Sequence, residues 1–161
     1  MRTSIAAAAA AAVLALLACS DALAPVTVGA PYLLRTVNGQ PLPWSTPPVD
    51  SQYIPTTITE GAVTFLDDSR AERNESIGRW VIVPPADSVW LSSAWSQIAF
   101  YKRGAGSIVL TYPGFQPGAI GPLHAAETLY VARGGALTLR ETGLISPLDS
   151  IIRVFCTTSN C

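Results

Sequence analysis

Residues 127–142, ETLYVARGGALTLRET, contain the clearest fold signal in the chain. Two segments in which apolar and polar residues alternate flank the pair Gly134-Gly135, and a period of two is typical of a half-buried strand. A Gly-Gly pair supplies the positive φ angles that tight hairpin turns need. The stretch therefore predicts a β-hairpin, although residues 123–133 would also suit a single helix.

A second hairpin signal lies further upstream, where Asn38-Gly39 follows the segment YLLRTV. Both central residues of a type I′ turn need positive φ, which Asn and Gly tolerate. Pro41 and Pro43 come next, and proline cannot donate a hydrogen bond to a sheet. We therefore expect the return segment to be an edge strand or a loop.

The rest of the chain repeats this pattern of short strands and turns. Residues 41–55 are rich in proline and serine and predict a long surface loop, with Trp44 covering one end of the core. A bulge or tight bend is expected at Gly61 and a turn at residues 67–69. In all, about eight to ten short strands are expected, which predicts an all-β domain with a single antiparallel sandwich or barrel.

The N-terminus reads as a targeting segment. Arg2 precedes an apolar run over residues 5–17, which is shorter than the about 20 residues that a membrane-spanning helix needs. Its length is typical of a signal-peptide core. A buried N-terminal helix is the alternative, but the run has no polar face. We therefore expect a signal helix that precedes the domain.

The run ends in LLAC, residues 16–19, which resembles the lipobox of bacterial lipoproteins. The resemblance implies a diacylglyceryl group on the Cys19 thiol and an acyl chain, such as palmitate, on its amino group after cleavage; two chains already anchor a protein stably. Ser20 rather than an acidic residue follows, which implies sorting to the outer membrane, facing the periplasm or the cell surface. The implied organisation is a signal peptide over 1–18, a lipidated tether over 19–31 and a β-barrel domain over 32–161.

The chain has three cysteines, so lipidation of Cys19 would leave Cys156 and Cys161 as a pair. Export would place them where disulfides form, and the intervening TTSN favours a turn. We expect a structural disulfide between them. Free thiols at the C-terminus are the alternative; two thiolates make a poor zinc site, and the spacing is not that of a redox-active pair.

The mature region resembles a group of small bacterial lipoproteins with lipocalin-like meander barrels. The segments that carry the resemblance are YLLRTVNGQPLP, EGAVTFLDD, GRWVIVPPADSVWLSS and GGALTLRE. It implies a lipocalin-like antiparallel meander barrel over most of residues 31–156. The stretch SRAERNESIG departs from the pattern of the group, and because the group has no established activity, no functional residue is carried over.

No arrangement of residues predicts catalysis, a cofactor or a metal site. His124 is the only histidine, no G-x-S-x-G motif accompanies it, and we expect it on the surface. The charged residues between positions 67 and 75 are of both signs, which favours a solvated strand over a calcium or paired-carboxylate site. The formal net charge of −1 gives no reason to expect nucleic-acid binding. We therefore expect a protein that is not an enzyme.

The tryptophans are the remaining candidates for contact with a ligand or a partner. Trp90 and Trp95 are separated by an odd spacing, so an unbroken strand would point them to opposite faces. An outward tryptophan predicts a contact for an envelope protein partner, and the first hypothesis is a tethered, non-enzymatic binding or interaction module. The alternative is a lipocalin-like carrier whose hollow barrel holds a small apolar ligand. The candidate contact residues are Trp44, Trp80, Trp90 and Trp95.

Overall fold

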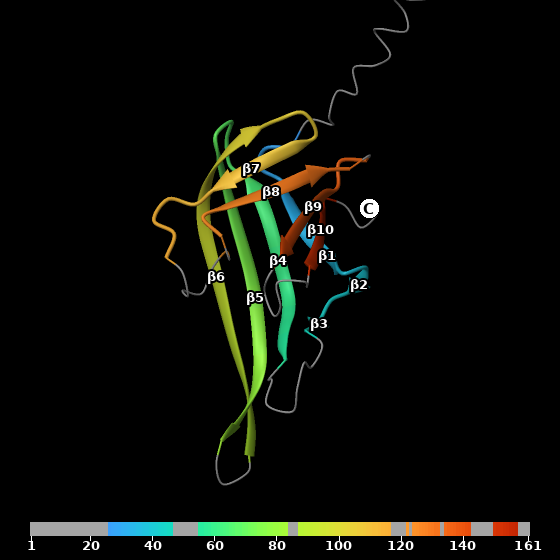
Figure 1. Cartoon of the computed structure of the whole chain (residues 1–161), viewed down its shortest axis with the longest axis vertical. Helices are drawn as coiled ribbons and strands as arrows, with labels where there is room; N and C mark the ends of the chain where they lie inside the picture. Colours follow the sequence, from blue (N-terminus) through green and yellow to red (C-terminus); the bar gives the residue numbers. More distant parts are fainter. Residues whose placement is uncertain are drawn as a thin grey trace, which may run out of the picture.

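The structure is a computed structural model that describes residues 26–46, 55–83, 87–116, 122, 124–132, 134–142 and 150–157. The predicted signal peptide, Cys19 and Cys161 lie outside these residues. The described residues form a single antiparallel sheet (Figure 1). Its strands are β1 (Pro31–Val37), β2 (Gln40–Pro41), β3 (Trp44–Ser45), β4 (Thr56–Phe65), β5 (Arg70–Val83), β6 (Asp87–Arg103), β7 (Ser107–Thr111), β8 (Ala126–Val131), β9 (Leu137–Thr142) and β10 (Ser150–Cys156).

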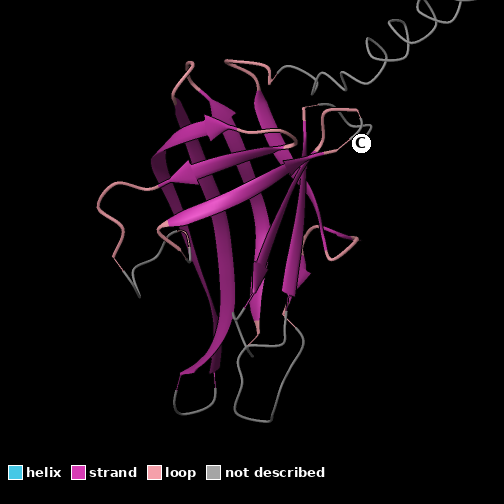
Figure 2. Ribbon diagram, turned by 45° about the horizontal axis from the view of Figure 1, so that its top comes forward, coloured by secondary structure: helices cyan, strands magenta, loops and turns pink. Residues whose placement is uncertain are grey.

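The sheet is a meander that closes on itself. From β4 to β10 each strand pairs with the next one along the chain, and β1 pairs with both β10 and β4. These eight strands make a closed antiparallel barrel, whose curvature is clear in Figure 2. The short strands β2 and β3 extend the sheet at its two ends. The prediction of an all-β antiparallel meander barrel is confirmed.

The glycine-containing turns lie where the sequence predicts them. Asn38 and Gly39 have φ angles of 52° and 75°, as a type I′ turn requires, and they join β1 to the edge strand β2. Gly134 and Gly135, with φ angles of 86° and 81°, lie between β8 and β9. Because β8 is a strand, the helical alternative for this segment is wrong. The irregularity expected near Gly61 is a shift of the β4–β5 register between Ile58 and Glu60.

Strands β5 and β6 form a hairpin that is longer than the barrel wall (Figure 1). Their pairing runs without a register shift from Arg70–Phe100 to Val83–Asp87. Strand β4 accompanies β5 only as far as Arg79. Beyond this point the described residues of the hairpin form two strands that project from the barrel as the hairpin extension, defined here as residues 80–83 and 87–90.

The lumen of the barrel contains an apolar core. Its centre is Phe65, whose ring makes edge contacts with Tyr32 at 5.7 Å and with Tyr101 at 5.0 Å between centroids. Trp44 on β3 is also buried in this core, as its predicted covering role requires. Other fully buried members are Val37, Val63, Ala71, Ala99, Leu110, Leu129, Leu137, Leu139 and Phe155.

The described end of the predicted tether contacts the barrel. Val28 forms a parallel bridge with Phe65 at the end of β4. The Gly29 amide donates a hydrogen bond to the Phe65 carbonyl at 2.8 Å. The chain therefore reaches the barrel at the end opposite the hairpin extension (Figure 1).

Asn38 joins the first hairpin to the last strand, and its substitution tests that role. The backbone amide of Asn38 donates to the Ile152 carbonyl, and its Oδ1 accepts from the Ile152 amide, both at 2.8 Å. Asn38→Ala removes the side-chain bond and strains the left-handed turn, so we expect a loss of about 1–3 kcal/mol of unfolding free energy, measured by urea denaturation. Gln40→Ala, at an exposed position, is the control. Equal urea midpoints for both variants would contradict the role.

Candidate functional site: a buried ionic cluster and an exposed tryptophan pair

The barrel contains charged side chains in its lumen. Arg73 and Glu75 on β5 are 1% and 5% exposed, so the expectation that all charges of this segment are solvated is wrong for these two. They share the inward face of β5 with Ala71 and Ile77, because side chains alternate along a strand. The other charges of the segment, Asp67, Asp68, Arg70 and Glu72, are exposed or half-buried.

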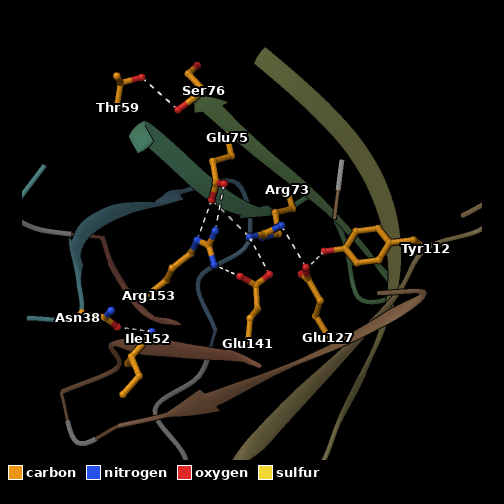
Figure 3. Close-up of polar contacts among 10 residues, drawn as sticks. All are labelled: Asn38, Thr59, Arg73, Glu75, Ser76, Tyr112, Glu127, Glu141, Ile152 and Arg153. Atoms are coloured by element: carbon orange, nitrogen blue, oxygen red, sulfur yellow. Dashed lines mark hydrogen bonds and ion pairs between the residues drawn. The ribbon is translucent and has the colours of Figure 1, made fainter. Parts of the chain in front are cut away.

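Both arginines of the cluster are paired with glutamates (Figure 3). Arg153 on β10 reaches Glu75 twice, at 3.2 Å from Nη2 to Oε1 and at 2.9 Å from Nε to Oε2, and it also pairs with Glu141 on β9. Arg73 lies 3.1 Å from Glu127 on β8 through Nη1, and 3.5 Å from Glu75 through Nη2. Because β5 does not pair with β8, β9 or β10, these contacts cross the lumen.

We define the buried ionic cluster as Arg73, Glu75, Glu127, Glu141 and Arg153. Two aromatic side chains contact it. The Tyr112 hydroxyl donates a hydrogen bond of 2.6 Å to Oε2 of Glu127. The Trp95 ring lies 4.8 Å from the Arg73 guanidinium, a cation–π arrangement. Trp95 therefore faces the inside of the barrel, where it contacts this cluster.

Burial and pairing act on the pKa values in opposite directions. Burial lowers the pKa of Arg73, but Glu127 and Glu75 together raise it above its ordinary value. For Arg153, burial outweighs the attraction of Glu75 and the pKa is lowered. Burial raises the pKa of Tyr112, with a further contribution from the negative charge of Glu127. The cluster is thus a set of groups that depend on one another for charge compensation.

The contacts of this cluster are ion pairs and the Tyr112 hydrogen bond. Its carboxylates are bound by guanidinium groups. His124 is exposed and lines a surface depression of about 260 Å³, to which residues of β8 and β9 also contribute. The described residues contain no group of His, Cys, Asp and Glu suited to hold a metal ion. The buried ionic cluster therefore holds strands together across the lumen.

Trp80 and Trp90 lie on the outer face of the hairpin extension. They are cross-strand partners whose ring centroids are 5.3 Å apart at an interplanar angle of 63°. They are 57% and 37% exposed. The Trp90 ring covers Gly78, since a Cβ there would lie only 2.0 Å from Cζ2 of the ring. Trp90 and Trp95 point to opposite faces, as the odd spacing predicts.

The opposite face of the extension is also apolar. Val89 and Leu91 on β6 are exposed on this side, and Leu91 contributes to a groove of about 470 Å³ with Ile77 and Arg79. An exposed apolar surface of this kind is typical of a contact site. The sequence predicts both tryptophans as candidate contact residues, but it does not predict the length of the hairpin that carries them away from the core.

Only one of the three cysteines lies within the described residues. Cys156 is buried at the end of β10, whereas Cys161 and Cys19 lie outside them. The Cys156–Cys161 disulfide and the lipid on Cys19 therefore stay predictions.

The fold and the sequence were compared with known proteins. No family model, curated protein or solved structure matches the chain significantly. Among the described residues, no helix has the length and apolar character to cross a membrane.

The buried ionic cluster predicts a large effect of removing one partner. Arg153→Met leaves Glu75 and Glu141 buried without their main counter-charge, and breaking a buried pair in this way costs about 3–5 kcal/mol. Arg140→Met, at an exposed position on β9, is the matched control and is expected to change the unfolding free energy by no more than about 0.5 kcal/mol. Urea denaturation of both variants measures the difference. Similar losses for the two would contradict the bridging role.

Tyr112 predicts a pH dependence of stability. Its pKa is raised in the folded state, so the folded protein keeps this proton at pH values where the unfolded chain, with a pKa of about 10, has lost it. The stabilisation is therefore complete below about pH 10 and is lost as the pH rises through the higher folded pKa. Tyr112→Phe should cost about 1–3 kcal/mol at pH 7 and reduce the decline above pH 10. An unchanged alkaline slope, relative to a Tyr130→Phe control, would argue against it.

Proposed function

We propose that this protein is a membrane-anchored envelope lipoprotein that acts as a non-enzymatic binding or interaction module, with the hairpin extension as its partner-contact surface. The observation that carries the proposal is the exposed Trp80–Trp90 pair. Tryptophan is enriched at the energetic centres of protein interfaces. A buried role for the pair is excluded by its exposure.

The direction of the hairpin supports this function. Val28 contacts Phe65 at one end of the barrel, and Phe65 pairs with Ala71 on β5. Trp80 lies nine residues further along β5, which is about 30 Å at the rise of a strand. A lipid on Cys19 would therefore hold the opposite end, and the tryptophan pair would face away from the anchoring membrane towards a protein.

The filled lumen favours a surface contact over an internal carrier. A lipocalin-like carrier needs a hollow barrel for its apolar ligand. In the described part of the chain the lumen holds the apolar core and the buried ionic cluster, with Arg73 among the largest fully buried side chains. An apolar ligand there would have to displace charged groups that compensate one another.

Photo-crosslinking in cells tests the contact surface. A photo-reactive phenylalanine analogue at position 80 or 90 of the full chain should give protein adducts on illumination. The same analogue at position 130 is the control, since Tyr130 is 54% exposed on β8. If positions 80 and 90 give no more adducts than position 130, the hairpin is not the contact surface.

The anchor is tested separately. Metabolic labelling with an alkyne fatty acid should label the wild-type chain, and Cys19→Ser should lose both the label and the membrane association. Mass spectrometry should place the mature N-terminus at Cys19. An unmodified chain that begins at Met1 would remove the anchor from the proposal.

A further inference from the structure

One long edge of β6 has no partner strand among the residues that the structure describes. Within these residues, β6 pairs with β7 only from Phe100 to Arg103, while its whole length pairs with β5 on the other side. From Ser88 to Ala99 no described residue therefore pairs with the backbone N–H and C=O groups of this edge. Such an edge is a template for another strand.

The residues of this edge lack the usual sequence features that protect against pairing. Monomeric proteins guard edge strands with charged residues, proline or bulges. Residues 88–101, SVWLSSAWSQIAFY, contain no charged residue and no proline, and the β5–β6 register has no shift. A strand added to this edge would meet neither like charges nor a distorted backbone.

The side chains on the outer row of this edge are arranged symmetrically. Every second residue from Trp90 to Ile98 belongs to this row, and their sizes are large, small, small, small and large. The middle residue is Ala94, which lies near the centre of the free edge. At one end the large residue is Trp90, and at the other it is Ile98, which is 41% exposed. The row is Trp90, Ser92, Ala94, Ser96 and Ile98.

We propose that the occupant of this edge is a second copy of this chain, paired antiparallel about a two-fold axis at Ala94. The inference rests on the proposed function, because it names the partner of the same hairpin. In this register Trp90 lies opposite Ile98 of the second copy, and Ser92 lies opposite its Ser96. Each tryptophan pair gains an aliphatic neighbour, and the small residues at the centre lie opposite small residues. The pairing extends from residue 89 to residue 99, because β7 occupies this edge from Phe100 on.

The symmetry favours a second copy over an unrelated strand. An isologous two-fold contact needs a surface that is complementary to itself, and the order of large and small residues from Trp90 to Ile98 is the same in both directions. The absence of charge matters as well, since any charge near the axis would face its own copy. An unrelated partner would need neither the symmetry nor the neutrality.

Disulfide trapping in cells tests the register with the full chain. A residue on the axis lies opposite itself with Cα atoms about 4.5–5.5 Å apart, which is within disulfide range. Ala94→Cys should therefore give a disulfide-linked dimer on a non-reducing gel after mild oxidation. Ser92→Cys is the matched control, because its equivalent lies about 13 Å further along the strand, and it should give no dimer.

A charge variant tests the same pairing in the Ala94→Cys background. Ser92→Lys with Ser96→Lys would place like charges directly opposite each other in the pair, which destabilises a sheet. In the Ala94→Cys background the dimer yield should fall on the order of ten-fold. Thr111→Lys, an exposed position on the fully paired β7, should leave the yield unchanged.

The outcomes separate this inference from the proposed function. Dimer from Ala94→Cys alone, lost with the lysine pair, supports the two-fold pairing. Equal trapping at positions 92 and 94, or none at 94, overturns it. If position 90 crosslinks to a different protein while position 94 gives no dimer, the binding function stands and the self-pairing is overturned; if neither gives an adduct, both are overturned.

Discussion

The ion pairs that cross the lumen are the constraint on which the rest of the structure depends. Arg73 and Glu75 on β5 are bound to partners on β8, β9 and β10, strands that lie across the barrel from β5. A barrel of eight strands has just enough interior for side chains, and here charged ones take the part that the apolar core leaves. Burying them is costly unless each is paired, so the strands must meet in one register.

This constraint determines where the molecule can make contacts. The interior of the barrel holds the core and the ion pairs, and exposed apolar side chains lie outside it, on the hairpin extension. The long β5–β6 hairpin presents these side chains because, within the described part of the chain, no other strand pairs with its extension.

Local signals predicted the elements, whereas the interior depended on contacts between distant strands. Asn38-Gly39 and Gly134-Gly135 predict their hairpins because turn geometry is local. The charges at Arg73 and Glu75 were expected in solvent, because a charged strand usually is solvated and the opposing charges come from other strands. One feature of the sequence indicates burial of these charges. Each residue of the buried ionic cluster lies on the same strand face as apolar residues, as Glu141 does with Leu137 and Leu139. Closure between β1 and β4 has no local signal.

The position of the chain's first described residues has a consequence for geometry on a larger scale. They meet the barrel at the pole opposite the tip of the long hairpin. In an antiparallel two-fold pair, one molecule is inverted relative to the other, so the two attachment points lie at opposite poles of the assembly. If the proposed lipid is present on Cys19 of both copies, such a pair is a strut that attaches to a bilayer at each end.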